Sequence, residues 1–599
     1  MRKLISLIII ALFVFSSAGN SSAKAEVESL KIGILSDEST LNPYTYQTGY
    51  PGLDLVSLLY DTLLQLDKDN KPVPWLVKEY KVSENGLEYS FKLNENIKWH
   101  DGQMLTSDDV KFTVDYFIKY PKSRFTNPLK NVASLTVENE TDFTMVLTKP
   151  DPNFMIQPLA DVPILPEHIW SKISDPDSET NAIGSGPYIL SEHKADQYYK
   201  MTANKDYFKE APPIQEIIFP IIKDTTALYN ALKSGEIDAI SSNISPELVN
   251  QFESNPSLKI SRGAGFSTTL FQLNSEKYPM TEKPFRQAID LAIDKKSLVD
   301  IVLLGFAEVG SPGFIHPSSP SYNGEVKTSY DPEKAKKILD DAGFKDTNGD
   351  GFREDQKGKE INFTTLVHSN NPIRIRVAEL ISEAINEIGI KNSVKAMEDT
   401  TIISLMWPDY DVSKGRNFDM GVFGWSNTMQ LFPDRIVELF YSDPAIGSVN
   451  IGGYKNKEFD ALSDQLRATF DETERQKLIN DLQLMVADEA PIITLYYQEI
   501  VNAYNPEKYD GYVFQTGKGI INKLSFVSGE RTENAAGNNS NSGGESKSSD
   551  EKTSNDSNSV KENNNNGILI FGVLIVIAAV FFFLLKRKKK KSEKDDFDF

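Results

Sequence analysis

The segment Pro284–Gly305 carries a clear periodic signal and limits the kind of fold that can be built around it. Its apolar residues recur three and four positions apart, which is the spacing of one face of a helix. They are Phe285, Ala288, Ile289, Ala292, Ile293, Val299 and Leu303. Pro284 suits a first helical turn, because the N–H that proline lacks would have no partner there. The pattern predicts one amphipathic helix packed on a core.

The residues from 26 to 528 alternate strand-like and helix-like stretches, which predicts an α/β fold. Tyr89 and Phe91 alternate with polar residues, as in a half-buried strand. Thr106, followed three residues later by Asp109, has the pattern of a capping box at the start of a helix. The chain has 599 residues, 40% hydrophobic and 25% charged, so it has enough apolar material for a large core.

Charge and cysteine content exclude several classes of function. The formal net charge of -21 argues against nucleic acid as a partner, since phosphate backbones are bound through basic surfaces. The chain has no cysteine, which excludes disulfides, thiolate metal sites, a cysteine nucleophile and a lipid-modified cysteine anchor. Residues 1–25 run from Arg2 and Lys3 through an apolar stretch to small residues, and predict a secretory signal peptide.

The C-terminal part of the chain has the composition of a tether and an anchor. Residues 529–566 are rich in Asn, Ser, Gly, Glu and Lys and predict a disordered tether. Ile568–Leu585 is uncharged and would be about 27 Å long as a helix at ~1.5 Å per residue, close to a bilayer core. We therefore predict a transmembrane helix at 567–585. The basic tail at 586–599 would lie in the cytoplasm and the body outside the cell.

Short motifs follow one another in a fixed order through the body of the chain. They are Leu41-Asn42-Pro43, Trp99-His100-Asp101-Gly102, Leu105–Val110, Pro163–Trp170, Gly184–Tyr188, Ala231–Asp238 and Asp419–Trp425. Together with the helix pattern after Pro284, they resemble family 5 solute-binding proteins, the oligopeptide-, dipeptide- and nickel-binding subunits of ABC importers. Each motif alone consists mostly of turn and packing residues, so the shared order carries the resemblance.

The resemblance implies a two-lobed α/β fold of the periplasmic-binding-protein type (type II), with the ligand between the lobes. We place lobe I at about 26–270 and 495–528, and lobe II at about 271–494. The chain would cross between the lobes near Phe271–Asn274 and near Thr494–Gln498, and these crossings would form a hinge.

The sequence lacks the motifs of an enzyme. It has no His-Glu-x-x-His, no Gly-x-Ser-x-Gly and no P-loop, so we predict no catalytic residue and no cofactor. The five histidines lie far apart in the sequence, and no metal site is predicted from them. Asp346, Asn348 and Asp350 have the spacing of the first half of a calcium loop, but Lys357 stands where the closing Glu belongs. Calcium at this turn is left open.

The segment from Met420 to Ser442 resembles the part of the family in which an Asp carboxylate takes the α-ammonium group of a bound peptide. Counted from Trp425, that position is held by Thr428, with Asn427 before it. A hydroxyl and an amide accept hydrogen bonds but bring no negative charge. Capture of a free amino terminus would then be weaker, or it would use another acid such as Asp434.

We predict five ligand-binding residues: Trp425, Asn427, Thr428, Trp407 and Tyr46. The two tryptophans could stack against the ligand, or they could be core aromatics. Tyr46 lies in the loop after the first predicted strand, where the family lines its cleft.

The function that the resemblance implies is an extracellular, membrane-anchored substrate-binding subunit of an ABC transporter. It would bind peptides or a similar small solute and deliver them to a permease with its ATPase subunits. Three alternatives stay open: a sensor or surface receptor that transports nothing, a surface hydrolase or adhesin, and a binding protein for a sugar or metal chelate. The predicted tail is too short for a signalling domain.

Overall fold

The computed structural model describes residues 27–44, 52–121 and 123–527. Their strands form separate sheets, and we name two lobes after them: lobe I is 27–263 with 500–527, and lobe II is 268–498. The predicted signal peptide, tether, transmembrane helix and tail lie outside the described residues, as does Tyr46. Within those residues, every helix is too short or too polar to cross a membrane.

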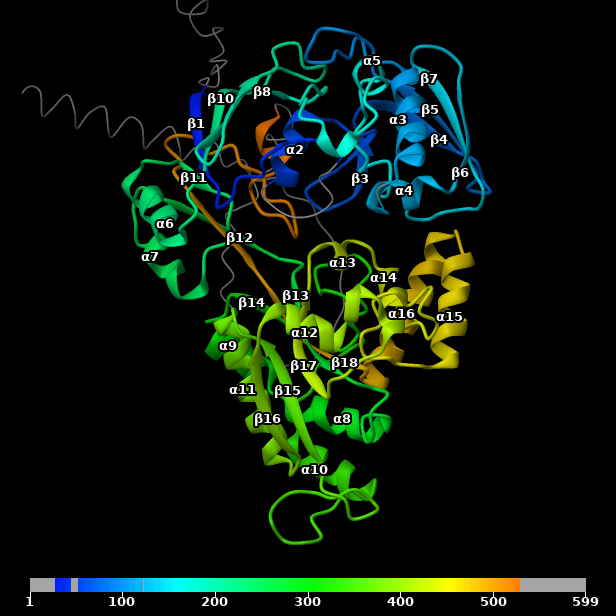
Figure 1. Ribbon diagram of the computed structural model, residues 1–599, viewed down its shortest axis with the longest axis vertical. Coiled ribbons are helices and arrows are strands. Elements are labelled where there is room, and N and C mark those ends of the chain that lie inside the picture. Colours follow the sequence, from blue (N-terminus) through cyan, green and yellow to red (C-terminus); the bar gives the residue numbers. More distant parts are fainter. Residues whose placement is uncertain (1–26, 45–51, 122, 528–599) are drawn as a thin grey trace, which may run out of the picture. The chain divides into compact units, whose positions relative to one another are not determined.

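Lobe I is built on a seven-stranded sheet in the order β12-β19-β11-β1-β10-β9-β8 (Figure 1). Its strands are β1 (Val27–Gly33), β8 (Tyr188–Lys194), β9 (Tyr198–Ala203), β10 (Ile214–Pro220), β11 (Ala239–Ile240), β12 (Lys259–Gly263) and β19 (Ile500–Tyr504). Strand β1 lies in the middle and runs parallel to β10 and β11. Strand β19 pairs with β12 and β11, so the chain returns to lobe I after it has built lobe II.

Lobe I also contains a four-stranded antiparallel sheet in the order β4-β5-β7-β6. Its strands are β4 (Val77–Val82), β5 (Glu88–Leu93), β6 (Val132–Val137) and β7 (Asp142–Leu147). Tyr89 and Phe91 in β5 are buried, as the alternating pattern predicts. Helix α3 (Ser107–Lys119) packs on this sheet, and Asp109 Oδ2 accepts from the Thr106 N–H at 2.9 Å. The predicted capping box is confirmed.

The remaining elements of lobe I lie between the strands of its sheets. They are β2 (Leu64–Leu66), β3 (Pro72–Pro74), α2 (Gly52–Leu59), α4 (Ser123–Leu129), α5 (Glu167–Trp170), α6 (Thr225–Ser234) and α7 (Val249–Glu253), with 3-10 turns at Pro176–Ser178, Pro246–Leu248 and Lys523–Phe526. Strands β2 and β3 form an antiparallel hairpin.

Lobe II is built on a six-stranded sheet in the order β14-β18-β13-β17-β15-β16. The strands are β13 (Thr268–Leu273), β14 (Ala307–Val309), β15 (Asn362–His368), β16 (Lys391–Met397), β17 (Met420–Trp425) and β18 (Ile492–Gln498). Strand β15 runs parallel to β16 and β17, whereas β13 runs antiparallel to β17 and β18. The lobe therefore has a mixed sheet, in agreement with the predicted α/β class.

The helices of lobe II pack on its sheet or on one another. They are α8 (Lys283–Ala292), α9 (Lys295–Val302), α10 (Pro332–Asp341), α11 (Pro372–Glu387), α12 (Asp399–Met406), α13 (Thr428–Leu431), α14 (Arg435–Phe440), α15 (Lys457–Ala468) and α16 (Glu472–Glu489), with 3-10 turns at Pro408–Tyr410 and Val412–Lys414. Figure 1 shows α11 beside β15 and β16, and buried residues of α11 and β15 share one core cluster with α8 and α9.

The chain passes between the sheets twice, from β12 to β13 through 264–267 and from β18 to β19 at Glu499. Phe271 and Thr494 lie inside strands of lobe II. The lobe boundaries and the hinge role of the two crossings stay a proposal.

The segment Pro284–Gly305 forms two helices, α8 and α9, so the prediction of one continuous helix is wrong. Ile293 has extended backbone angles, φ -93 and ψ 113, and ends α8. Asp294 then caps α9, because its Oδ1 accepts from the Ser297 N–H at 3.0 Å. The apolar residues of the stripe are all buried in one core cluster, so the helical break leaves their burial unchanged.

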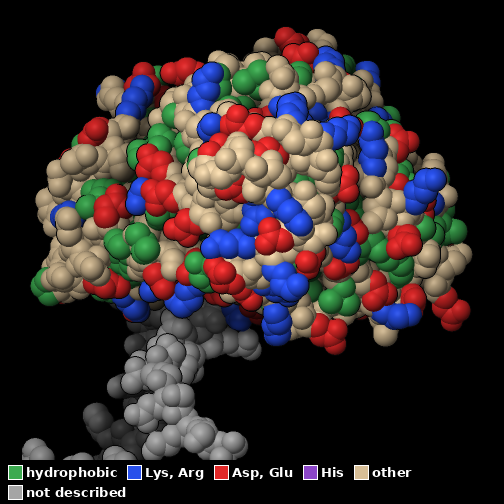
Figure 2. Space-filling model, turned by 90° about the horizontal axis from the view of Figure 1, so that it is seen from below, with side chains coloured by type: hydrophobic (Ala, Val, Ile, Leu, Met, Phe, Trp, Pro, Cys, Tyr) green, Lys and Arg blue, Asp and Glu red, His purple; other side chains and the backbone are tan. Residues whose placement is uncertain are grey.

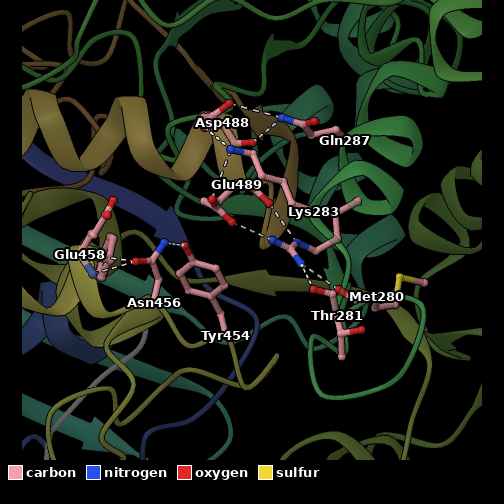
Figure 3. Close-up of polar contacts among 11 residues, drawn as sticks. Met280, Thr281, Lys283, Gln287, Tyr454, Asn456, Glu458, Asp488 and Glu489 are labelled. Atoms are coloured by element: carbon pink, nitrogen blue, oxygen red, sulfur yellow. Dashed lines mark hydrogen bonds and ion pairs between the residues drawn. The ribbon is translucent and has the colours of Figure 1, made fainter. Parts of the chain in front are cut away.

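Arg286, on α8, fixes this helix to the end of α16. Its guanidinium group donates to Glu489 Oε2 at 3.0 Å, to the Glu489 carbonyl at 2.9 Å and to the Met280 carbonyl at 2.9 Å. Figure 3 shows Lys283 and Gln287 turned toward Asp488 at the same helix end. Cations near the carbonyl end of a helix are favoured by the helix dipole. The resemblance of this segment to the family sequence is thus explained by helix packing.

A buried ion pair holds the last described segment on lobe I. Lys523 Nζ lies 2.6 Å from Asp61 Oδ1, and the two side chains are 2% and 0% exposed. Asp61 also accepts from Trp75 Nε1 at 2.8 Å, Tyr207 Oη at 3.1 Å and Ser185 Oγ at 3.1 Å. Burial lowers the pKa of Lys523. The carboxylate has a donor on each oxygen, which a buried charge requires.

Surface charges are mixed in sign. On the face in Figure 2, Lys and Arg side chains are interspersed with Asp and Glu side chains. Some form pairs one helical turn apart, such as Lys296 with Asp300 at 2.6 Å and Lys337 with Asp341 at 3.1 Å. Exposed pairs of this kind contribute about 0.3–0.5 kcal/mol each.

Candidate ligand-binding cleft

A cleft of about 1420 Å³, which we call the wide cleft, is lined by both lobes. Lobe I contributes the β2–β3 hairpin, the facing parts of β4 and β5, and the turn Asp151–Ile156. Lobe II contributes the turn Ser318–Ser321, residues around α13 and the first turns of α16. A ligand in this cleft therefore touches segments from two separately built sheets.

One polar contact joins the lobes across the wide cleft. Asn153 Nδ2 of lobe I donates to Asp434 Oδ2 of lobe II at 3.2 Å. The same oxygen forms an ion pair with the Arg475 guanidinium on α16. Asp434 Oδ1 is buried and has no hydrogen-bond partner among the described residues. Burial raises the pKa of Asp151, and the charge of Asp434 acts in the same direction.

A second contact between the lobes is apolar. Phe470, which lines the wide cleft just before α16, packs against Gly86 in the turn between β4 and β5. Gly86 has a φ of +66, and a Cβ atom there would lie 2.7 Å from a ring carbon of Phe470. Only glycine combines this backbone angle with so close an approach. The turn is thus shaped to receive the ring.

A small cavity of about 150 Å³ adjoins the wide cleft. Both are lined by Asn70, Leu431 and Thr516, so the two spaces share a border. Asn427 lies in the wall of the small cavity. Its Nδ2 donates to the Gly517 carbonyl of lobe I at 2.5 Å, and its Oδ1 accepts from Ser267 Oγ at 2.7 Å. Asn427 thereby links lobe II to lobe I and to one crossing of the chain.

Trp425 and Trp407 lie together at the end of β17 and after α12. Their rings meet edge to face, with centroids 5.6 Å apart at 73°. Both indole Nε1 atoms are buried without a hydrogen-bond partner among the described residues. Neither ring is part of the walls of the wide cleft or the small cavity. The structure thus brings the pair together beside a core cluster, and their ligand role stays a prediction.

Thr428 begins α13, next to Asn427, and only its backbone belongs to the described part of the chain. No sequence motif indicated Asn153, Phe470 or Arg475 as residues of the site. These residues are far from the 420–442 segment in the sequence, and only the tertiary fold brings them to the cleft. Asp434, considered as a substitute acid, does line the wide cleft, where Arg475 already neutralises it.

The turn with the calcium-like spacing brings three carboxylates together. Ligand atoms of Asp346, Asp350 and Glu354 lie within 4.8 Å of one another. Glu354 is buried and already accepts from the Thr347 N–H at 2.7 Å, Thr347 Oγ1 at 2.6 Å and Asn348 Nδ2 at 2.8 Å. The turn is held by hydrogen bonds within the protein.

Comparison with known proteins extends over most of the chain. Residues 71–448 match the model of bacterial extracellular solute-binding proteins, family 5 Middle. The chain is 30% identical to the oligopeptide-binding protein AppA of Bacillus subtilis, over 86% of this chain and 96% of that protein.

Solved structures give the same result. The structure of AppA from Bacillus subtilis in complex with a nonapeptide is matched with a TM-score of 0.64 and 28% identity, over 83% of this chain and 98% of that one. NikZ from Campylobacter jejuni in complex with Ni(L-His) is matched with a TM-score of 0.66 and 27% identity, over 82% and 96%.

The C-terminal residues correct the predicted location. Residues 562–592 match the LPXTG cell wall anchor motif, which overturns a single-pass membrane helix with a cytoplasmic tail. An apolar run followed by basic residues occurs both in membrane spans and in anchoring signals, so length and charge could not separate them. The Leu-Pro-x-Thr-Gly pentapeptide itself does not occur within 562–592. The matched residues comprise the apolar run and most of the basic residues after it.

Proposed function

Because this chain belongs to the bacterial extracellular solute-binding proteins of family 5, we propose that it is the substrate-binding subunit of an ABC importer and that its substrate is an extended peptide. The peptide is held between the lobes by non-covalent contacts and passed to a permease that works with ATPase subunits. The chain performs no covalent chemistry, in keeping with a family of binding proteins.

The observation that carries the proposal is the size and double lining of the wide cleft. Pockets for small molecules usually enclose about 300–1,000 Å³. The wide cleft, at about 1420 Å³, exceeds that range, and its walls come from both lobes. Such a space suits an extended chain better than a single compact solute. The similarity to a protein whose structure contains a nonapeptide supports the same choice.

Closure of the lobes follows from the contacts between them. Asn153 with Asp434 and Phe470 with Gly86 join the two lobes, and Asn153, Asp434 and Phe470 line the wide cleft. A ligand that touches both lobes adds contacts only when they are together, so it shifts the equilibrium toward the closed form. We propose the crossings at 264–267 and Glu499 as the hinge.

Trp425, Asn427, Thr428, Trp407 and Tyr46 remain our proposed ligand-binding residues. Asn427 is supported by its place in the wall of the small cavity. The two tryptophans are supported by their buried indole N–H groups, which lack an acceptor within the described residues. A buried donor without a partner costs about 1–3 kcal/mol, which a ligand carbonyl could recover.

A metal chelate is the second candidate, because a protein bound to Ni(L-His) is among the similar structures. The positions of the histidines argue against a histidine-based metal-chelate site in the cleft. They pair as His100 Nε2 with the Gly186 carbonyl at 3.0 Å, His168 with Asp101 at 2.7 Å, His193 with Asp37 at 3.1 Å, His368 with Asp399 at 2.7 Å, and His316 Nδ1 with the Ser318 N–H at 2.9 Å. Over the described ranges, none lines the wide cleft or the small cavity.

The proposal is tested with the full chain purified in mild detergent. Native mass spectrometry should detect co-purified peptides, and nonapeptides should raise the thermal unfolding temperature. A ligand at 100 times its dissociation constant stabilises a protein by about 2.7 kcal/mol. Stabilisation by a nickel chelate or a sugar, without any by peptides, would reject the peptide assignment.

A further inference from the structure

The small cavity and the wide cleft have wall residues in common. Asn70 and Thr516 of lobe I and Leu431 of lobe II belong to the walls of both spaces. A peptide lying in the cleft can therefore send one side chain past these three residues. The cavity is lined by residues of both lobes, so it is complete only when the lobes are together.

The walls of the small cavity are largely apolar. Helix α2 supplies Leu53 and Val56, the β2–β3 hairpin supplies Leu66, and Ala160 and Leu431 are further apolar residues of the lining. Burial of apolar groups contributes about 25 cal/mol per Å². An apolar side chain therefore gains free energy by leaving water for this space.

The lysines in the wall already have carboxylate partners. Lys518 Nζ lies 3.1 Å from Asp54 Oδ1, and Lys523 Nζ lies 2.6 Å from Asp61 Oδ1. An acidic side chain of the ligand would have to compete with these pairs. Asp161 is also part of the wall, so the experiment has to distinguish an apolar ligand side chain from a cationic one.

The volume sets the size of the side chain. The small cavity measures about 150 Å³. An apolar cavity of about 150 Å³ in another protein binds benzene. Leucine and phenylalanine side chains fit a space of this size, whereas an indole ring is larger than benzene and overfills it.

We infer that the small cavity is a specificity subsite that receives one leucine- or phenylalanine-sized apolar side chain of the bound peptide. This inference rests on the proposed function, because it presupposes a peptide in the wide cleft. It adds the chemical class of one peptide residue and the walls that select it.

The test is a positional scan with alanine-based nonapeptides and the full chain in detergent. Each position in turn carries Gly, Leu, Phe, Trp or Lys, and dissociation constants are measured by calorimetry. One position should favour Leu or Phe over Gly by about 10- to 200-fold, the range for apolar groups in a fitted pocket. Trp at that position should bind more weakly than Phe.

Ala160→Leu fills the cavity and should remove the preference for Leu and Phe over Gly. Ser57→Leu, on α2 in the same wall, provides a second filling variant should the first unfold. Ala342→Leu is the matched control, since Ala342 packs on the core of lobe II. It should keep the preference.

The outcomes separate the inference from the proposed function. If no nonapeptide binds, the proposed function fails. If peptides bind without a position that favours Leu or Phe, or with one that favours Lys, the subsite assignment is overturned. The subsite assignment is also overturned if both filling variants fold and still prefer Leu or Phe at that position, as the control does.

Discussion

The two lobes each contain a carboxylate paired with a cation, and the two pairs are built differently. Asp61 in lobe I has donors on both oxygens, and neither it nor Lys523 is more than 2% exposed. Asp434 in lobe II is 19% exposed, binds Arg475 and Asn153 through one oxygen, and leaves the other without a partner. A buried carboxylate with donors on both oxygens stabilises the fold. A carboxylate in a cleft wall that has one oxygen without a donor can still accept a further hydrogen bond.

Charge removal should affect the two sites unequally. Asp61→Asn leaves Lys523 buried without a counter-ion, so we expect the free energy of unfolding to fall by about 3–5 kcal/mol. Asp434→Asn should cost about 1 kcal/mol, because the pair is closer to solvent and Arg475 also donates to the Leu466 and Thr469 carbonyls. Urea unfolding of both variants makes the comparison. Equal losses would contradict it.

The lobes should also respond to acid with opposite signs. Burial raises the pKa of Asp54 in lobe I from 3.8 to about 6. Its contribution to stability is present below pH 3.8 and is lost as the pH rises to about 6. Burial lowers the pKa of His316 in lobe II from 6.5 to about 4. Its contribution is present above pH 6.5 and is lost as the pH falls to about 4. Each shift corresponds to roughly 3 kcal/mol.

Two variants isolate these contributions. Between pH 6.5 and pH 4, Asp54→Asn should lose more unfolding free energy than the wild type, and His316→Gln should lose less. Chemical unfolding at several pH values gives both differences. If the unfolding free energy of both variants depends on pH in the same way as that of the wild type, neither group titrates as its burial implies.

In lobe II, the tryptophan pair should affect peptide affinity more than stability. Trp425→Phe keeps the aromatic packing and removes an indole N–H that has no acceptor within the described residues. We expect peptide affinity to fall about tenfold, or ~1.4 kcal/mol, with little change in unfolding free energy. Trp170→Phe, in a buried site of lobe I, is the control and should leave affinity unchanged. Unchanged affinity in the Trp425 variant would make this residue a packing residue only.

The smallest expected effect concerns the apolar contact between the lobes. Phe470→Ala removes the ring that packs on Gly86 and should weaken peptide binding by roughly threefold, about 0.7 kcal/mol, because the closed form loses one contact. The free energy of unfolding should stay nearly the same. Phe352→Ala, a half-buried ring elsewhere in lobe II, serves as the control. An equal loss of affinity in both variants would argue against a closing contact.

Local sequence patterns predicted local structure well. The alternation at Tyr89 and Phe91 and the capping box at Thr106 depend on neighbours in the sequence, and both are confirmed. The break at Ile293 escaped prediction, because apolar spacing of three and four persists across two helices that share one face. Asp294 was the available signal, since it is a good N-cap residue.

The site was less predictable, because its walls come from distant parts of the chain. The resemblance to the family directed attention to the 420–442 segment, and Asn427 and Asp434 from that segment do line the small cavity and the wide cleft. Asn153 and Arg475 carry no sequence signal of their own and meet Asp434 only through the tertiary fold. At the C-terminus, an apolar run and basic residues suggested a membrane span, whereas the match to a cell wall anchor corrects that reading.

We propose that the two lobes close around an extended peptide. Small-angle X-ray scattering tests closure directly when it is recorded with and without a binding nonapeptide. The full chain is measured in a detergent whose scattering contrast is matched to that of the solvent. We predict that the radius of gyration of the protein decreases when the peptide is bound. A radius that stays the same at saturating peptide would contradict the account.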